Sequence, residues 1–356
     1  MRHFVKGLFR ESSLISLISI FLGLFLGALI MLTGQYNPFH AYASLFNKSF
    51  GDLYSIGESI RQLTPLIFTG LSVAFAFRTG LFNIGAEGQF IMGALAADFV
   101  GIQLHLPWYL HIPLAVVAGG LLGGLWGSIA GYLKAVRGVH EVITTIMLNW
   151  IALHISNYFV KAYLLEPGQM RSKFIDKSVW LSSPGLSALF GNSRIHYGIV
   201  IALILAVLFY VILWKTKTGY ELRAVGFSPE ASEYAGINVN ANIVKAMFVS
   251  GIFAGVGGAC EVLGVFHYQA INTSFPGYGM MGIAVALIGR NTPVGTILSA
   301  ILLGVLTYGA SGMKFGAGVP EELINIIIAL IIFFVAASGI VKLLLKQFAK
   351  RNKDVI

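Results

Sequence analysis

The sequence predicts an all-α polytopic membrane protein with about ten transmembrane helices and with both termini in the cytoplasm. Of its 356 residues, 56% are hydrophobic and only 11% are charged, whereas a soluble domain carries about 25% charged residues. The apolar runs are long and do not alternate, as at 16–32 and 200–213, which excludes the short alternating strands of an outer-membrane barrel. Lysines and arginines also gather on alternate loops, a bias that marks the cytoplasmic side.

Ten apolar segments are long enough, or nearly long enough, to count as spans. They are about 14–33, 62–78, 84–104, 112–133, 142–163, 197–214, 241–265, 278–289, 294–309 and 322–342. With a cytoplasmic N-terminus, 16 of the 24 Lys and Arg residues fall inside, as the positive-inside rule requires. The segment 278–289 is short and could be a re-entrant half-helix, but counting it as a crossing keeps the Lys-rich tail inside. We therefore expect one transmembrane domain over 1–356, with an extracellular loop at about 164–196 and a cytoplasmic loop at about 215–240.

Composition also limits the chemistry. The one cysteine, Cys260, excludes an internal disulfide and a multi-cysteine metal site. The net charge of +9 indicates basic cytoplasmic loops in a membrane protein, so we expect no nucleic-acid partner. No Ser/His/Asp or metal-spaced constellation is present, and we predict neither catalytic residues nor a metal site.

The residues 80–89 interrupt an apolar run with three glycines and with the polar side chains Asn83, Glu87 and Gln89. Irregular backbone at membrane depth is tolerated only where protein or water satisfies it. Glu87 lies roughly 13 Å along a regular helix from Arg78, near the middle of a hydrocarbon core of about 30 Å. An ionisable group there is costly and indicates function. Glu87 either lines a substrate path or, with Asn83, caps the free N–H groups of a broken helix.

Three further residues are candidates for a substrate path. Asn149 and Trp150 lie about two turns into the fifth span, at a depth similar to that of Glu87, and Glu261 lies in the outer half of the seventh span. Each could also simply bond to a neighbouring helix. The candidate pathway residues are Asn83, Glu87, Gln89, Asn149, Trp150 and Glu261.

The cytoplasmic loop predicts a two-turn helix at about 229–235. Ser228 is a good N-cap, Pro229 suits the first helical position, and Glu230 complements the positive end of the helix dipole. Gly236 can end the helix in the left-handed conformation. A tight loop would be enough to join two spans, so a rigid short helix indicates mechanical contact with a cytoplasmic partner.

At this loop the sequence resembles a known family. Residues 219–237, GYELRAVGFSPEASEYAGI, resemble the cytoplasmic coupling loop of ABC-importer permeases in the branched-chain amino acid, simple sugar and nucleoside permease family. Residues 80–89 and 141–149 resemble motifs of the sugar and nucleoside branch, and residues 284–295 also fit, although the turn 290–293 is bulkier and more charged than in some relatives. The resemblance covers about 15–340, and the nucleoside members, served by a basic-membrane-protein type lipoprotein, are nearest.

The resemblance implies a type II ABC importer permease in a bacterial cell membrane, translocating nucleosides by alternating access. A separate ATPase subunit would drive it, since this chain lacks the G-x-x-x-x-G-K-[ST] phosphate loop; the chain itself is then not an enzyme and holds no cofactor. The implied partners are that cytoplasmic ATPase, a second homologous permease or a second copy of this chain, and an extracytoplasmic substrate-binding lipoprotein. The residues implied to contact the ATPase are Arg223, Ser228, Pro229, Glu230, Ala231, Tyr234, Ala235 and Gly236.

Two other functions remain open from the sequence. One is a simple-sugar (ribose-like) importer of the same class. The other is a secondary transporter that uses Glu87 and Glu261 as proton or Na⁺ sites. Dependence on ATP would separate the importers from the secondary transporter.

Overall fold

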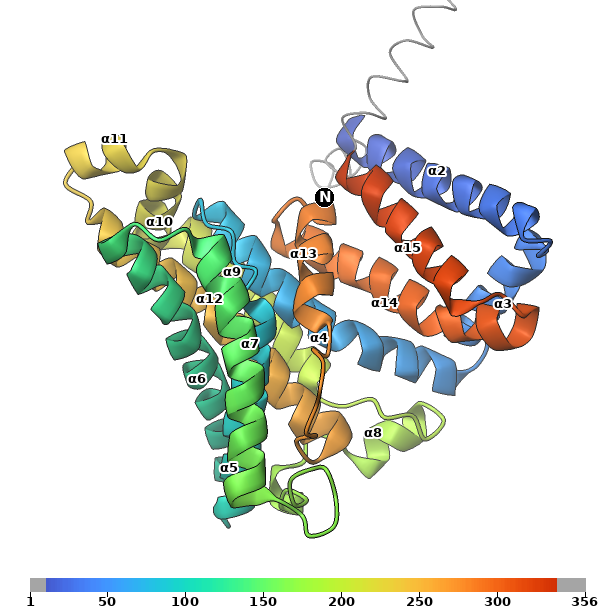
Figure 1. Cartoon of the computed structure of the whole chain (residues 1–356), viewed down its shortest axis with the longest axis horizontal. Coiled ribbons are helices and arrows are strands. Elements are labelled where there is room, and N and C mark those ends of the chain that lie inside the picture. Colours follow the sequence, from blue (N-terminus) through green and yellow to red (C-terminus); the bar gives the residue numbers. More distant parts are fainter. Residues whose placement is uncertain (1–10, 338–356) are drawn as a thin grey trace, which may run out of the picture. The chain divides into compact units, whose positions relative to one another are not determined.

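The computed structural model describes residues 11–337, which fold into helices joined by loops (Figure 1). The helices are α2 (Glu11–Thr33), α3 (Pro38–Phe50), α4 (Leu53–Arg78), α5 (Ala86–Gln103), α6 (Trp108–Arg137), α7 (Glu141–Phe159), α8 (Pro184–Leu189), α9 (Gly198–Lys215), α10 (Lys217–Phe227), α11 (Pro229–Tyr234), α12 (Val239–Glu261), α13 (Tyr278–Ile288), α14 (Pro293–Ala317) and α15 (Glu321–Ala336). Single π-helical turns extend α7 (Val160–Leu164) and α12 (Val262–Phe266), and a 3₁₀ turn spans Lys177–Val179.

The all-α prediction is confirmed, and each of the ten predicted apolar segments contains a helix. Among the described residues, six helices are long and apolar enough to cross a membrane: α4, α6, α7 with its π turn, α9, α12 with its π turn, and α14. Shorter apolar helices lie at Ile18–Thr33 and Tyr278–Ile288. The cytoplasmic position of the two termini stays a prediction from the charge count, and the C-terminal Lys-rich tail lies outside the described residues.

The described residues form two compact units, one comprising residues up to Gly51 and from Val305, the other comprising Asp52–Gly304. In the first unit α2 packs along α15, and a Cβ added at Gly23 would lie 2.7 Å from the Ile331 Cα. The prediction of one permease domain over the whole chain stays a prediction. All candidate site residues belong to the second unit.

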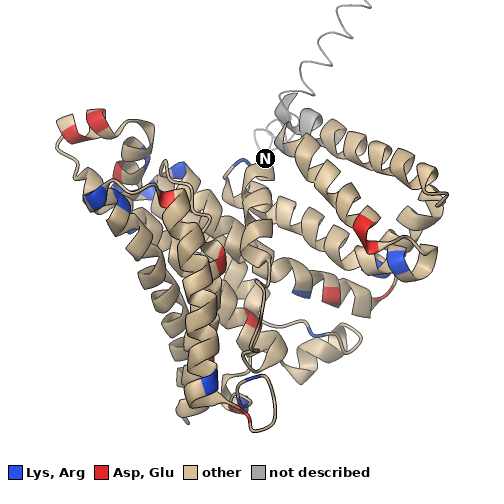
Figure 2. Ribbon diagram, in the orientation of Figure 1, with Lys and Arg blue, Asp and Glu red and all other residues tan. Residues whose placement is uncertain are grey.

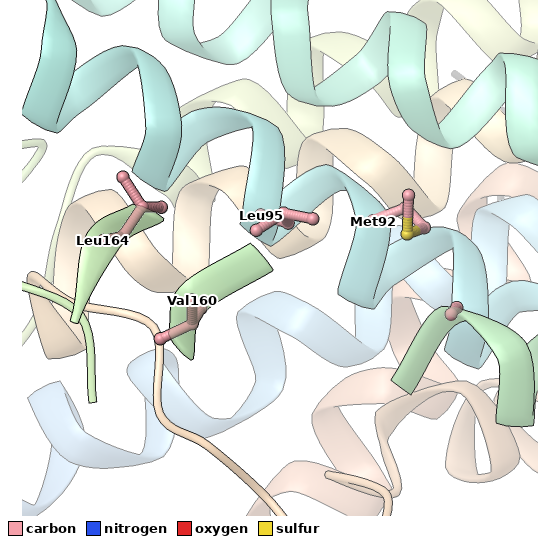
Figure 3. Packing of buried hydrophobic residues seen from close by; sticks show 5 residues of the cluster. Met92, Leu95, Val160 and Leu164 are labelled. Carbon is pink, nitrogen blue, oxygen red and sulfur yellow. The ribbon is translucent and has the colours of Figure 1, made fainter. Parts of the chain in front are cut away.

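The second unit is built around α12, which packs against α4, α5 and α6. The contact between α6 and α12 depends on glycine, because a Cβ at Gly251 would meet the Gly123 carbonyl oxygen at 2.3 Å and one at Gly123 would meet the Gly255 Cα at 2.6 Å. Small residues let helix backbones approach without a hydrophobic driving force. Beside this contact, Met92 and Leu95 of α5 pack against the end of α7 and its π turn (Figure 3).

The cytoplasmic loop is more helical than the sequence predicts. The two-turn helix is confirmed as α11, with the Ser228 Oγ accepting from the Ala231 N–H at 3.2 Å and Gly236 left-handed at φ 78°. The preceding helix α10 was not predicted, since its residues are polar and include two glycines. Figure 2 shows charged residues gathered around α10 and α11 and few along α6 and α9 of the same unit.

Candidate translocation site and coupling helix

The helix α13 is a half-helix. Its 11 residues give a length of about 16 Å at 1.5 Å per residue, roughly half of a hydrocarbon core of 30 Å. The chain reaches it from the π turn of α12 through an irregular segment, residues 267–277, which begins and ends with left-handed residues, His267 and Gly277. The segment 278–289 therefore forms a half-helix, the alternative that its short length suggested. This helix alone is too short to cross a membrane.

Glu87 caps the N-terminus of this half-helix. Its Oε1 accepts from the Gly277 N–H at 2.7 Å, and its Oε2 accepts from the N–H groups of Gly279 at 2.5 Å and Met280 at 3.2 Å. The first N–H groups of a helix have no partner within the helix, and a carboxylate there also complements the dipole. A Cβ at Gly279 would lie 2.3 Å from the Glu87 nitrogen, so only glycine permits this approach. Glu87 is fully buried and caps a helix other than its own.

Arg78 holds the other end of α13. Its Nε donates to the Asn291 carbonyl at 2.8 Å and its Nη2 to the Arg290 carbonyl at 3.0 Å. Arg290 and Asn291 both have φ of 53°, a left-handed conformation that is costly for residues other than glycine. The half-helix thus has a carboxylate at its positive end and a guanidinium at its negative end.

Asn83 and Gln89 form a buried amide network behind the broken segment. The Asn83 Nδ2 donates to the Gln89 Oε1 at 2.8 Å and to the Ser250 Oγ at 2.7 Å. The Asn83 Oδ1 accepts from the Gly85 N–H at 2.9 Å and from the Gln89 Nε2 at 3.1 Å. This network joins the loop before α5 to α5 itself and to α12, and it fixes the loop.

Asn149 caps α5 from a neighbouring helix. Its Oδ1 accepts from the Gly88 N–H at 2.8 Å, and its Nδ2 donates to the Ile84 carbonyl at 3.1 Å. The next residue, Trp150, is 46% exposed, and its ring lies 4.5 Å from that of Phe275. Two adjacent candidates therefore have different surroundings, one inside the bundle and one on its surface.

A cavity of about 330 Å³ lies between α5, the end of α12 and the segment that leads to α13. Its lining includes Phe90, Glu261, Phe266, Asn272, Phe275 and Tyr278. Of the six predicted pathway residues, only Glu261 lines this cavity directly. Trp150 contacts one of its walls through Phe275, whereas Asn83, Glu87, Gln89 and Asn149 support the elements around it.

Glu261 ends a chain of alternating charges. The Glu58 carboxylate accepts from the Arg194 Nη2 at 2.8 Å and from the Arg61 Nε at 2.9 Å. The Arg61 Nη1 lies 3.9 Å from the Glu261 Oε1, which also accepts from the Tyr278 hydroxyl at 3.2 Å. The Glu261 Oε2 is buried and has no hydrogen-bond partner among the described residues. Sequence reasoning counted both arginines as loop cations and missed this network; the only local signal was the i, i+3 spacing of Glu58 and Arg61.

The loop at about 164–196, predicted to be extracellular, covers the segment that lines the cavity. The Ser172 N–H donates to the Gln269 carbonyl at 2.9 Å, and the Ile175 N–H donates to the His267 carbonyl at 3.0 Å. Farther along the loop, burial lowers the pKa of His196 to about 4, from an ordinary value near 6.5. His196 is therefore neutral at neutral pH.

The helix α11, named the coupling helix for its predicted role, has an exposed surface. Tyr234 is 97% exposed, and Phe227, just before the helix, is 90% exposed. The Ser228 Oγ also donates to Glu230 at 3.2 Å, and the Arg223 Nε donates within α10 to the Gly219 carbonyl at 3.4 Å. Pro229, Ala231, Ala235 and Gly236 complete this surface.

The coupling surface connects to the broken segment through one glycine contact. A Cβ at Gly226 of α10 would lie 2.7 Å from the Thr79 carbonyl carbon, and one at Gly80 would lie 2.7 Å from the Gly226 Cα. Gly80 begins the loop that Asn83 fixes and that leads to Glu87. The helix α10 is therefore packed directly on the loop that leads to the half-helix.

A bundle of apolar helices with a half-helix, a buried ion-pair chain and an exposed two-turn helix is the architecture expected of a membrane permease. In the part of the chain that the structure describes, no three His, Cys, Asp or Glu side chains gather as metal ligands. The chain belongs to the family described as the permease component of the branched-chain amino acid transport system, whose pattern matches residues 55–336. The predicted resemblance is thereby confirmed.

Curated relatives agree with this assignment. The guanosine ABC transporter permease protein NupP of Bacillus subtilis is 50% identical over 341 residues, covering 96% of this chain and 98% of the relative. The nucleoside ABC transporter permease protein NupB of Lactococcus lactis is 39% identical and covers 94% and 93%. The glucose ABC transporter permease protein TsgB13 of Haloferax volcanii is 31% identical and covers 91% and 87%. No solved structure matches the chain.

Proposed function

We propose that this chain is the permease subunit of a nucleoside importer of the ABC class, which works by alternating access. The observation that carries the proposal is the exposed helix α11, whose supporting helix α10 packs directly on the loop that leads to Glu87. The substrate class is supported by NupP and NupB, both named for nucleosides. A simple-sugar importer is the second candidate, because TsgB13 is named for glucose.

In the proposed mechanism, closure of a partner ATPase on ATP moves α11. The Gly226–Gly80 contact passes this movement to the loop before α5, which the Asn83 and Gln89 amides keep rigid. Glu87 then carries it across to α13 through three backbone hydrogen bonds. Because α13 and the segment before it line the cavity, the cavity changes shape when the ATPase closes.

The remaining partners follow from the same proposal. The chain pairs with a second permease, either a homologous subunit or another copy of itself, and an extracytoplasmic lipoprotein delivers the nucleoside to the face of the extracellular loop. ATP binds to the partner ATPase and not to this chain. Asn83, Glu87, Gln89 and Asn149 position the path, and Glu261 and Trp150 lie along it.

The ion-coupled alternative fits the geometry less well. A proton or Na⁺ site at Glu87 needs carboxylate oxygens that are free to bind the ion, yet both oxygens of Glu87 accept from backbone N–H groups. Glu261 retains one unpartnered oxygen but already faces the positive charge of Arg61.

The substrate class is tested by uptake in cells that express this chain together with its proposed ATPase, second permease and receptor. We expect labelled guanosine to accumulate and excess unlabelled nucleosides to compete, while ribose and glucose do not. Competition by ribose or glucose alone would instead support the sugar importer.

A further inference from the structure

One carboxylate oxygen in the wall of the cavity is buried and has no partner among the described residues. Glu261 is 3% exposed, lines the cavity, and its Oε2 has no hydrogen-bond partner among residues 11–337. A buried acceptor without a donor carries the full cost of its desolvation. A ligand that brings an N–H or O–H group to this oxygen would remove that cost.

The charge chain fixes the orientation of the Glu261 carboxyl group. Its Oε1 faces the Arg61 Nη1 at 3.9 Å and is bonded by the Tyr278 hydroxyl at 3.2 Å. Arg61 is in turn held by Glu58 at 2.9 Å. The guanidinium and the tyrosine hydroxyl both engage the Oε1, so the Oε2 is the carboxyl oxygen left for a ligand.

The walls of the cavity suit a flat aromatic ring. Phe90, Phe266, Phe275 and Tyr278 line it, and the rings of Phe90 and Tyr278 lie 5.3 Å apart. Aromatic side chains stack on nucleobases. The volume of about 330 Å³ is at the low end for small-molecule sites, which suits a single nucleoside.

A polar edge of the cavity is also fixed in place. Asn272 lines it, and its backbone is held on both sides by Asn157, whose Oδ1 accepts from the Asn272 N–H at 3.1 Å and whose Nδ2 donates to the Asn272 carbonyl at 2.7 Å. The Asn272 side chain can therefore meet ribose hydroxyls at a defined position.

Building on the proposed nucleoside function, we propose that this cavity is a nucleoside subsite in which the Glu261 Oε2 accepts from adjacent N–H donors of the base, as guanine offers at N1 and N2. Adenine presents its N1 acceptor beside its amino donor, so a lone pair faces the carboxylate. Cytosine does the same at N3. Glu261 thus selects guanine-type bases within the permease itself.

The first test uses the unaltered protein and varies the ligand. Equilibrium binding of labelled nucleosides is measured on the assembled importer in lipid nanodiscs without its receptor, so that receptor specificity does not contribute. We expect guanosine to bind most tightly, inosine more weakly, and both adenosine and 1-methylguanosine about tenfold or more weaker than guanosine, the effect of losing a hydrogen bond to a charged group. Equal binding of guanosine and 1-methylguanosine would overturn the proposal.

The second test changes the carboxylate. Glu261→Gln is expected to remove the preference for guanosine over adenosine while adenosine binding stays within about twofold, because the amide loses the charge that strengthens the bond to guanine and also carries an N–H donor that can face the adenine N1. Asp98→Asn is the matched control, since Asp98 is also a fully buried carboxylate with one unpartnered oxygen on its Oδ2 but does not line the cavity. An unchanged preference in Glu261→Gln, or an equal loss in Asp98→Asn, would overturn the assignment.

The two proposals fail differently. If the unaltered importer binds no nucleoside but binds ribose or glucose, the proposed substrate class is wrong. If it binds guanosine, adenosine and 1-methylguanosine with equal affinity, only the proposed role of Glu261 is wrong.

Discussion

The half-helix α13 and the coupling helix α11 both have polar residues around them, but Glu87 near α13 is buried and hydrogen-bonded whereas most of those on α11 are exposed. Around α13 every capping group has a fixed partner, and Glu87 alone accepts three backbone N–H groups. At α11 the surface is bare, with Tyr234 97% exposed. The difference indicates that polar residues near α13 hold the fold in the low-dielectric bundle, whereas most of those on α11 are exposed, as the proposed contact with an ATPase requires. Substitutions in the two regions should therefore fail in different assays.

The largest effect is expected at the half-helix. Glu87→Ala leaves three buried N–H groups without an acceptor, and we expect it to destabilise the protein by about 3 kcal/mol or more and to reduce uptake to background. Thermal unfolding in detergent and uptake of labelled guanosine measure the two effects. Glu87→Gln keeps one acceptor oxygen and should lose less. Unaltered uptake in Glu87→Ala would remove α13 from the proposed mechanism.

Substitutions in the coupling helix should impair assembly with the ATPase and leave the stability of the protein unchanged. Ala235→Trp and Glu230→Lys change exposed positions of this surface, so the melting temperature and membrane insertion should stay as in the unaltered protein. Disruption of an interface hot spot costs about 2 kcal/mol or more, so co-purification with the ATPase should fall about thirtyfold. Tyr220→Ala, an exposed aromatic position on α10, is a control for general surface effects. Normal complex formation by both variants would contradict the coupling assignment.

A smaller effect is expected where the two regions meet. Gly226→Ala places a methyl group 2.7 Å from the Thr79 carbonyl carbon, and overpacking of this kind costs about 1–3 kcal/mol. We expect assembly to persist while guanosine uptake per hydrolysed ATP falls several-fold. Gly185→Ala is a matched control, because its Cβ would meet only the Ser183 Oγ at 3.9 Å. Full coupling in Gly226→Ala would exclude this contact as the route.

The smallest effect lies outside both regions and appears only in acid. Because His196 has a pKa of about 4 in the fold and near 6.5 when unfolded, protonation favours the unfolded chain. The neutral His196 therefore contributes to folding stability above pH 6.5, and this contribution is lost as the pH falls towards 4. The loss is about 3 kcal/mol, because each unit of pKa shift represents about 1.4 kcal/mol. His196→Gln should melt with a shallower acid dependence than the unaltered protein. Identical acid profiles for the unaltered protein and His196→Gln would contradict the burial argument.

The features that the sequence predicted are those formed by residues close together along the chain. The bounds of the helix α11 were predicted almost to the residue. Ser228, Pro229 and Gly236 start and end a helix through contacts with residues only a few positions away in the sequence. The helix α10 was missed because its stability comes from packing on α9 and on the loop at Gly80. Glu87 was recognised as either a cap or a path residue, but the helix that it caps lies 190 residues along the chain, beyond the reach of local patterns.

The ion-pair chain shows the same limit. Glu58, Arg61 and Arg194 are surface-type residues by sequence, and only the fold brings Arg194 beside Glu58 and Arg61 near Glu261. Sequence reasoning selected Glu261 for its depth but could not find the arginine and the tyrosine that orient it. It also proposed Asn83, Gln89 and Asn149 for the path, whereas the structure partners their side-chain amides with the loop and helices around them.

The account depends most on the claim that movement of α11, driven by ATP, opens the path near α13. The most direct measurement is guanosine uptake into proteoliposomes that contain this chain with its ATPase, second permease and receptor, with and without ATP. We predict uptake only when ATP and the ATPase are both present and an ion gradient has no effect. Gradient-driven uptake by this chain alone, without the ATPase, would contradict the account.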